Sequence, residues 1–213
     1  MCGRFTVVLE EETLKNEFHV EAPPGFTYES YNVAPSQTVP IVHLDDNQKR
    51  QFSLMEWGFL PSWAKDYKGT IRPINARLET IGNSPMFKSS FQKQRCLIPV
   101  PGFYEWDPKT TPKRPFYFYE QKRPIFAFAG IWSIWKKEAG VILSFAIITN
   151  KAEESVKAIH GRMPVVLDKE HHEFWLGEGL LPNKPPSLTY HAVDLKVNSP
   201  KNNGPDLITP LGF

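Results

Sequence analysis

The chain has 213 residues, 41% hydrophobic and 23% charged, which is long enough for one globular domain with a substantial core. Its formal net charge of +2 is too small to predict nucleic-acid binding by itself, so any basic surface must be local. No apolar run approaches the roughly 18 residues of a membrane span, and the amino terminus shows no secretory signal. We therefore expect a cytoplasmic protein with no membrane partner.

The first predicted elements are a short amphipathic helix over Glu10–Phe18 and an ordered loop from Pro23 to Gln37. Two strands, Thr38–Leu44 and Gln51–Trp57, flank the polar turn DDNQK. Because proline cannot donate a main-chain hydrogen bond, Pro40 favours an edge position for the first of these strands. This part of the chain therefore predicts a helix, a loop and a hairpin.

The rest of the chain alternates strand and helix signals. Ser84-Pro85 resembles a helix start, with a helix running to about Gln94. A capping-box pattern at Asn150 predicts a helix that ends near His160, and Asp168 is expected to cap another that buries Phe174 and Trp175. Four further strands are predicted over residues 96–106, 115–119, 124–132 and 142–149.

Together these elements predict an α+β fold. We expect one domain over residues 1–213, with a mostly antiparallel, curled and barrel-like sheet and flanking helices. The strands lack regularly alternating helices, which argues against a Rossmann-type sheet.

The chain has two cysteines, Cys2 and Cys96. A reducing compartment argues against a disulfide between them, and two cysteines without a histidine cluster argue against structural zinc. We expect no metal and no cofactor. His171 and His172, adjacent on a predicted helix, are expected to be surface residues.

Cys2 carries distinctive chemistry if Met1 is removed, as is general when the second residue is small. An amino-terminal cysteine bears an amine and a thiol on one residue, and together they can convert an aldehyde into a thiazolidine. At pH 7 about 14% of an α-amine of pKa about 7.8 is neutral, against about 0.04% of a lysine. The alternative is a cysteine that merely follows the initiator Met.

Three further segments contain candidate site residues. In Pro73-Ile74-Asn75-Ala76-Arg77, an extended backbone places the amide and the guanidinium on one face, where they could hold a sugar and a phosphate. The alternative is a polar loop.

A second segment, Gly102-Phe103-Tyr104-Glu105-Trp106, sets a carboxylate among large aromatic rings. Partial desolvation there would raise the pKa of Glu105 toward the range useful for acid–base chemistry. The open alternative is a strand glutamate that faces solvent.

The third segment, His160-Gly161-Arg162-Met163-Pro164, places a histidine before a glycine at a predicted helix end. His160 could be an acid–base group or only a capping residue.

Taken together, these segments resemble the SOS response-associated peptidase (SRAP) family, whose members process abasic sites. The resemblance spans nearly the whole chain. It rests on MCGRF at 1–5, YNVAP at 31–35, WGF and PSW within 57–63, INAR at 74–77, GFYEW at 102–106, Thr149, HGRMP at 160–164, Val197-Asn198 and GPDLI at 204–208.

The resemblance implies a protein that acts in the DNA damage (SOS) response and crosslinks to the ring-opened abasic sugar in single-stranded DNA. In that interpretation Cys2 is the nucleophile, Asn75 orients Cys2 or the sugar, and Glu105 and His160 exchange protons. The DNA-binding residues it implies are Arg4, Trp63, Arg77 and Arg162. Some members have two tryptophans where this chain has Trp63-Ala64.

The same Schiff base could instead nick the strand by β-elimination, as a lyase does. We expect a monomer that is nucleoid-associated when it acts on DNA. Two rival functions stay open: an amino-terminal-nucleophile peptidase or amidohydrolase that removes Met1 from itself, and a non-catalytic single-stranded DNA-binding module.

Overall fold

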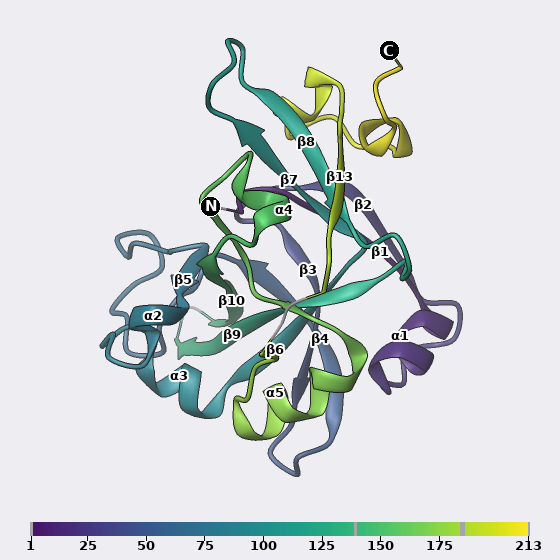
Figure 1. Cartoon of the computed structure of the whole chain (residues 1–213). Helices are drawn as coiled ribbons and strands as arrows, with labels where there is room; N and C mark the ends of the chain where they lie inside the picture. The colour runs from purple at the N-terminus through teal and green to yellow at the C-terminus, as the bar shows by residue number, and fades with distance from the viewer. Residues whose placement is uncertain (1, 139, 184–185, 213) are drawn as a thin grey trace.

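Two β-sheets organise the chain, seen in a computed structural model that describes residues 2–138, 140–183 and 186–212 (Figure 1). The first sheet runs in the order β13 (Thr189–Ala192), β8 (Arg114–Tyr119), β7 (Gly102–Asp107), β1 (Phe5–Glu10) and β2 (Thr27–Val33). The second follows the path β11 (Arg162–Pro164), β10 (Gly140–Lys151), β4 (Arg50–Trp57), β3 (Thr38–Leu44), β6 (Arg95–Val100), β9 (Phe126–Lys137) and β12 (Val166–Leu167), with β5 (Asn75–Arg77) beside β10.

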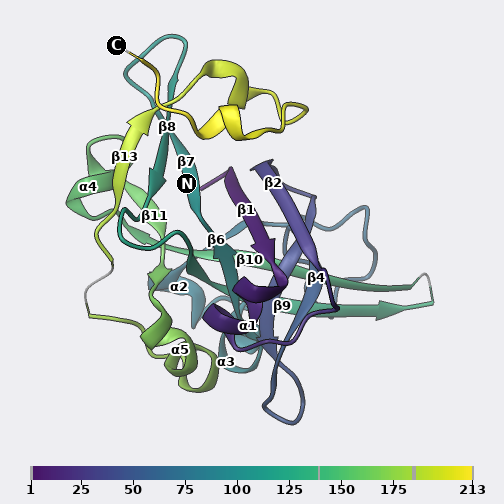
Figure 2. The ribbon, with the colours of Figure 1, turned by 90° about the vertical axis from the view of Figure 1, so that its right-hand side faces the viewer.

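The second sheet closes on itself. β9 and β10 pair antiparallel over most of their length, which joins the two ends of the path β10–β4–β3–β6–β9 into a five-stranded barrel. Among the described strands, the pairings of β10 with β4 and with β5 are the parallel ones. The expected α+β fold with a mostly antiparallel, curled sheet is therefore confirmed. Figure 2 shows β9 and β10 projecting beyond the body of the two sheets.

Helices are short and flank the sheets. They are α1 (Glu11–Phe18), α2 (Leu78–Ile81), α3 (Lys88–Lys93), α4 (Glu154–Lys157) and α5 (His172–Glu178), with 3-10 turns η1 (Lys169–His171), η2 (Leu195–Asn198) and η3 (Pro205–Ile208). No helix in the described part of the chain is both long and apolar enough to cross a membrane.

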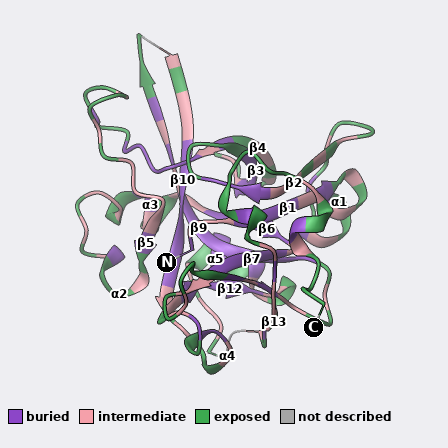
Figure 3. Cartoon of the chain, turned by 90° about the horizontal axis from the view of Figure 1, so that it is seen from above, coloured by how far each residue is buried: buried purple, intermediate pink, exposed green. Residues whose placement is uncertain are grey.

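Aromatic rings join the two sheets in the core. The ring of Phe5 on β1 meets Trp57 on β4 edge to face at 4.8 Å, and Phe103 on β7 meets Phe128 on β9 at 5.6 Å. All four side chains are essentially buried. In Figure 3 the strands around the middle of the molecule are mostly purple, the colour of buried residues. Each fully buried ring of this kind contributes about 1.5–3 kcal/mol, so the start of β1 is held firmly against the barrel.

Several strand predictions need correction. The expected loop over residues 23–37 contains β2, which is the edge strand of the first sheet. The first five residues of β2 are at least partly exposed and its last two are buried. The strand expected over residues 96–106 divides at Pro101 into β6 and β7, which belong to different sheets.

Pro40 lies in an interior strand rather than at a sheet edge. β3 has β4 on one side and β6 on the other, but β6 pairs only with Val42 and His43. Pro40 therefore lies beyond the part of β3 that is enclosed, where its missing N–H removes no hydrogen bond to β6.

Two details of the predicted helices are also wrong. Asn150 belongs to β10 and caps no helix, because α4 begins later at Glu154. Phe174 is half exposed, although Trp175 beside it is buried as expected.

His172, expected on the surface, is only 2% exposed and stacks on Phe18 of α1 at 5.1 Å. Burial and, to a smaller extent, the charge of Arg50 lower the pKa of His172 to about 3, so the ring is neutral and packs as part of the core.

Candidate active site around Cys2

The pairing of β1 with β7 fixes where Cys2 lies. Phe5 pairs with Phe103, and the Tyr104 N–H donates to the Arg4 carbonyl at 3.0 Å. The residues just before β1 therefore run beside the strand that carries Glu105. The Cys2 side chain is fully buried there, with its sulfur 3.8 Å from the Arg4 carbonyl oxygen.

Asn75 holds Cys2 from the barrel side. β5 runs parallel to β10 and starts at Asn75, whose Nδ2 donates to the Cys2 carbonyl at 2.8 Å. The other amide atom, Oδ1, is buried and receives no hydrogen bond from any residue that the structure describes. Since buried polar atoms normally have partners, this acceptor is available to a bound molecule.

Glu105 is a buried acid, only 3% exposed. Its strand begins at Gly102, where a Cβ would collide with Tyr117 and the Phe118 carbonyl, so only glycine permits this close pairing with β8. Burial raises the pKa of Glu105, and the charge of His160 opposes that rise. The aromatic environment therefore favours a protonated carboxyl, as the sequence pattern predicts.

The thiol of Cys2 experiences the same environment. Burial raises the pKa of the Cys2 thiol, and the nearby Glu105 charge raises it further. Glu105 thus interacts electrostatically with both Cys2 and His160, which are far apart in sequence. The structure brings Cys2, Asn75, Glu105 and His160 into one cluster.

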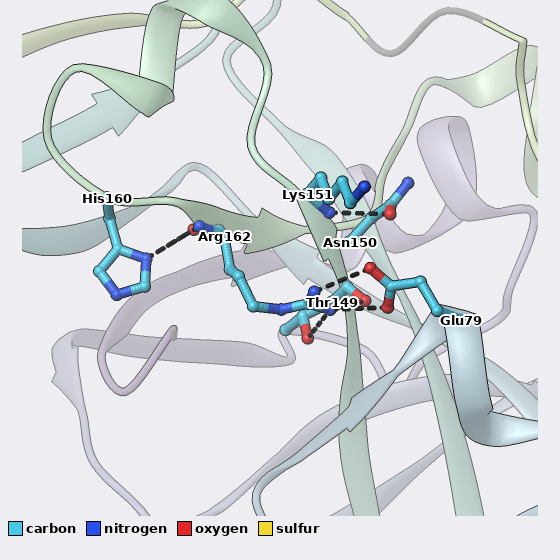
Figure 4. Close-up of polar contacts among 6 residues, drawn as sticks. All are labelled: Glu79, Thr149, Asn150, Lys151, His160 and Arg162. Atoms are coloured by element: carbon cyan, nitrogen blue, oxygen red, sulfur yellow. Dashed lines mark hydrogen bonds and ion pairs between the residues drawn. The ribbon is translucent and has the colours of Figure 1, made fainter.

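His160 is braced by the main chain of Arg162. Its Nδ1 lies 2.9 Å from the Arg162 carbonyl oxygen and 3.1 Å from the Arg162 amide nitrogen (Figure 4). A neutral ring can accept from the amide, and an imidazolium can donate to the carbonyl. Either protonation state of His160 therefore finds a partner in the same residue, which suits a group that exchanges protons.

The three arginines differ in how far they are already engaged. Arg4 is half-buried, and its Nη1 donates to Asn32 Oδ1 at 2.6 Å and to the Val197 carbonyl at 2.8 Å. Arg77 is exposed, and its side chain makes no hydrogen bond or ion pair within the described residues. Arg4 therefore has a structural role that its sequence position does not reveal, whereas Arg77 is open to a ligand.

Arg162 is intermediate between these two. Its guanidinium makes a bidentate ion pair with Glu79 of α2, at 2.8 and 3.0 Å. Its Nη2 also donates to the carbonyl and hydroxyl oxygens of Thr149 on β10, at 2.7 and 3.1 Å. Figure 4 shows the carboxylate of Glu79 directed at the guanidinium.

Trp63 is 62% exposed in the segment between β4 and β5. The next residue, Ala64, is buried, and its carbonyl accepts from the Trp135 indole at 2.9 Å. A second large ring at position 64 would not fit this packing, so this chain presents a single exposed tryptophan.

Two residues at the site were not singled out from the sequence. Asn32 is 2% exposed, and its amide joins Arg4 to the carbonyls of Val197, Ser199 and Asn202, which ties the segment after Cys2 to the carboxy-terminal turns. Glu79 pairs with Arg162 across 83 positions of sequence. Neither long-range contact has a local sequence signal.

Both cysteines are free and buried, and no group of three or more metal-ligating side chains gathers within residues 2–138, 140–183 and 186–212. Met1 lies outside the described residues, so its expected removal stays a prediction.

Comparisons with known proteins agree with the motifs. The family model "SOS response associated peptidase (SRAP)" matches residues 1–200. The abasic site processing protein YoqW of Bacillus subtilis is 38% identical, over 98% of this chain and 99% of its own length. The abasic site processing protein YedK of Escherichia coli is 29% identical, over 99% of this chain and 100% of its own. The abasic site processing protein HMCES of Xenopus tropicalis is 28% identical over 85% of this chain, but only 66% of its own length is matched.

A crystal structure of a Bacteroides thetaiotaomicron protein, 24% identical, superposes with a TM-score of 0.86 over 99% of this chain and 100% of that one. It has the same fold. Since the family model covers residues 1–200 and YoqW is similar along nearly the whole length, this chain belongs to the SOS response associated peptidase (SRAP) family.

Proposed function

We propose that this protein processes abasic sites in DNA, and that it captures them in single-stranded DNA by a covalent bond to Cys2 once Met1 has been removed. The observation that carries the proposal is the cluster in which Asn75 bonds the Cys2 carbonyl while Glu105 interacts with both Cys2 and His160. An amine, a thiol, a neutral acid and a proton carrier are the groups that thiazolidine formation needs. The names of the relatives, abasic site processing proteins, support the same substrate.

In the first step the neutral α-amine of Cys2 adds to C1′ of the ring-opened sugar. The sugar needs no base flipping, because an abasic site has no base to unstack. Before this addition the closed sugar ring opens: His160 takes the proton of the 1′-hydroxyl and delivers a proton to O4′, which leaves the aldehyde that the amine attacks. The amine acts before the sulfur, because burial keeps the thiol protonated while an α-amine is partly neutral near pH 7.

The carbinolamine then loses water. Glu105, whose pKa is raised by burial, donates a proton to the departing hydroxyl and then takes up the proton of the Cys2 nitrogen, which leaves water and an imine between that nitrogen and C1′. The thiol adds its sulfur to the imine carbon, and its proton ends on the nitrogen, which closes the five-membered ring. If closure is slow, loss of the 3′ phosphate by β-elimination from the same imine would nick the strand.

DNA is held by the basic residues beside the cluster. Arg77 is exposed and unengaged among the described residues, and Arg162 lies next to His160. Arg4 contributes mainly to the structure of this surface, because its Nη1 already donates hydrogen bonds to Asn32 and to the Val197 carbonyl. Trp63, exposed on the segment before β5, could stack on an unpaired base.

The test is a denaturing gel of the protein with uracil-containing single-stranded DNA that has been treated with uracil glycosylase. Wild type should give a heat-stable adduct, and Cys2→Ala should give none because it has no sulfur. Cys2→Ser should leave only a Schiff base that borohydride can trap. Cys96→Ala is the matched control, since Cys96 is the other buried free cysteine, on β6.

The outcomes separate this proposal from its rivals. A full adduct with Cys2→Ala would refute it. A binding module predicts reversible binding and no heat-stable product with any variant. A peptidase confined to its own amino terminus predicts loss of Met1 and no DNA product.

A further inference from the structure

Glu79 occupies the face of Arg162 that a phosphate would use. Both carboxylate oxygens bond the guanidinium in parallel, at 2.8 and 3.0 Å. Phosphate oxygens bind arginine in the same fork-to-fork geometry, so the two anions cannot share those N–H groups. The carboxylate of Glu79 therefore occupies the position on Arg162 where a DNA phosphate would bind.

The surroundings of Glu79 are cationic. Arg77 lies two residues before it at the end of β5, and Lys151 at the end of β10 acts on it electrostatically. The hydrogen bond from Arg162 lowers the pKa of Glu79 to about 2, so the carboxylate stays charged at any physiological pH. One acid thus sits among the cations that a DNA backbone would meet.

Arg162 does not depend on Glu79 for its position. Its Nη2 also donates to the carbonyl and hydroxyl oxygens of Thr149, a fully buried residue of β10. Its side chain is 18% exposed, whereas that of Glu79 is 38% exposed. The arginine is anchored by the barrel, and the glutamate is the member of the pair that is free to move into solvent.

We propose that Glu79 is a built-in competitor of DNA phosphate for Arg162, and that it limits how tightly the protein binds a DNA strand before covalent capture. This rests on the proposed function. Intact single strands must displace Glu79 to gain the Arg162 contact, which weakens their binding. The penalty falls equally on damaged and intact strands, but a strand whose abasic sugar reaches Cys2 is held by the covalent bond, whereas an intact strand keeps only the weakened contacts.

The experiment measures binding of a single strand that carries a tetrahydrofuran abasic analogue, which has no aldehyde and cannot crosslink. Fluorescence anisotropy gives the affinity of wild type and of the Glu79→Gln, Glu79→Ala, Arg162→Ala and Glu79→Gln/Arg162→Ala variants. Glu79→Gln and Glu79→Ala should bind about three- to tenfold more tightly, since an exposed ion pair is removed together with one repulsive charge. The slope of log K against log salt should steepen by about 0.7, the value of one added phosphate.

The part of the gain that comes from freeing the guanidinium requires Arg162, so Glu79→Gln should improve binding much less in the Arg162→Ala background than in wild type. Glu17→Gln is the matched control, because it removes the same charge from an ion pair, that of Glu17 with Lys169, in which the glutamate is 41% exposed. Glu17 belongs to α1, which lies on the opposite side of the molecule from α2 (Figure 1). Weaker or unchanged binding of the Glu79 variants, or an equal gain from Glu17→Gln, would overturn the proposal. A different combination of results would refute the proposed function alone. In that case Glu79→Gln tightens binding of the analogue as expected, but wild type forms no adduct with a true abasic strand.

Discussion

Replacing Glu105 by Gln should slow crosslinking and stabilise the protein at the same time. Gln has nearly the same shape but cannot ionise or donate an acidic proton to the departing hydroxyl. Loss of one general acid–base group typically costs a factor of about 10²–10⁴ in rate. Single-turnover crosslinking should therefore fall by about that factor near neutral pH, and its pH profile between pH 5 and 9 should lose the limb that depends on the carboxyl.

The stability change has the opposite sign because the acid is buried. Burial raises the pKa of Glu105, so above the unfolded-state value of about 4.3 the folded protein holds this proton more tightly than the unfolded chain does. The stability that the protonated Glu105 carboxyl contributes is fully present below about pH 4.3, and it is lost as the pH rises through the folded-state pKa of this group. Desolvation of a buried polar group costs on the order of 1–3 kcal/mol, and a protein of this size gains about 2–4 °C in Tm per kcal/mol. Glu105→Gln should thus raise Tm by about 2–12 °C at pH 8, and by nothing near pH 4.

The test measures the Tm of wild type and of Glu105→Gln at pH 8 and pH 4, and the crosslinking rate of the same two proteins. Glu120→Gln is a suitable control, since Glu120 is also a largely buried acid, 11% exposed, but pairs with Arg123. It should leave the crosslinking rate unchanged. A wild-type rate and pH profile for Glu105→Gln would show that Glu105 shapes the pocket without transferring protons. A lower Tm at pH 8 would refute the argument from burial.

Four further outcomes are expected. His160→Gln should slow ring opening and the reversal of the adduct together, measured by single-turnover formation and by release into excess competitor. Arg77→Ala should weaken single-strand binding and reduce a salt slope of roughly −2 to −3 by about 0.7, with adduct chemistry unchanged at saturating DNA; a salt-independent affinity would contradict a phosphate-guided surface. Asn32→Ala removes four hydrogen bonds of a buried amide and should lower the free energy of unfolding by about 1–3 kcal/mol, measured by denaturant unfolding. Mass spectrometry should show loss of Met1, and an uncleaved amino-terminal tag should abolish crosslinking; equal reactivity of the tagged protein would exclude the α-amine of Cys2.

What the sequence could predict depended on local signals. The helix at α1 and the strands β3 and β4 follow from periodicity and a polar turn, and their observed bounds differ from the predicted ones by at most one residue. The buried position of Glu105 follows from its aromatic neighbours. These features are set by side chains within a few positions of one another.

Features set by distant partners could not be predicted. Nothing near His172 in sequence indicates that Phe18 will cover its ring. The engagement of Arg4 by Asn32 and the pairing of Arg162 with Glu79 likewise depend on pairing between distant strands, β1 with β2 in the first case and β10 with β5 and β11 in the second. Motif matching therefore identified which arginines lie near the site but not how much of each guanidinium is left for a ligand.

Burial decides the order in which the two nucleophiles of Cys2 would act. The thiol lies in a fully buried position that disfavours its thiolate, so sulfur is a poor first nucleophile. An imine at C1′ changes this balance, because its carbon is strongly electrophilic and its nitrogen can take the thiol proton within the same residue. Sulfur addition then needs no free thiolate. A buried thiol is thus compatible with rapid ring closure after imine formation, and it is protected from other electrophiles before the imine forms.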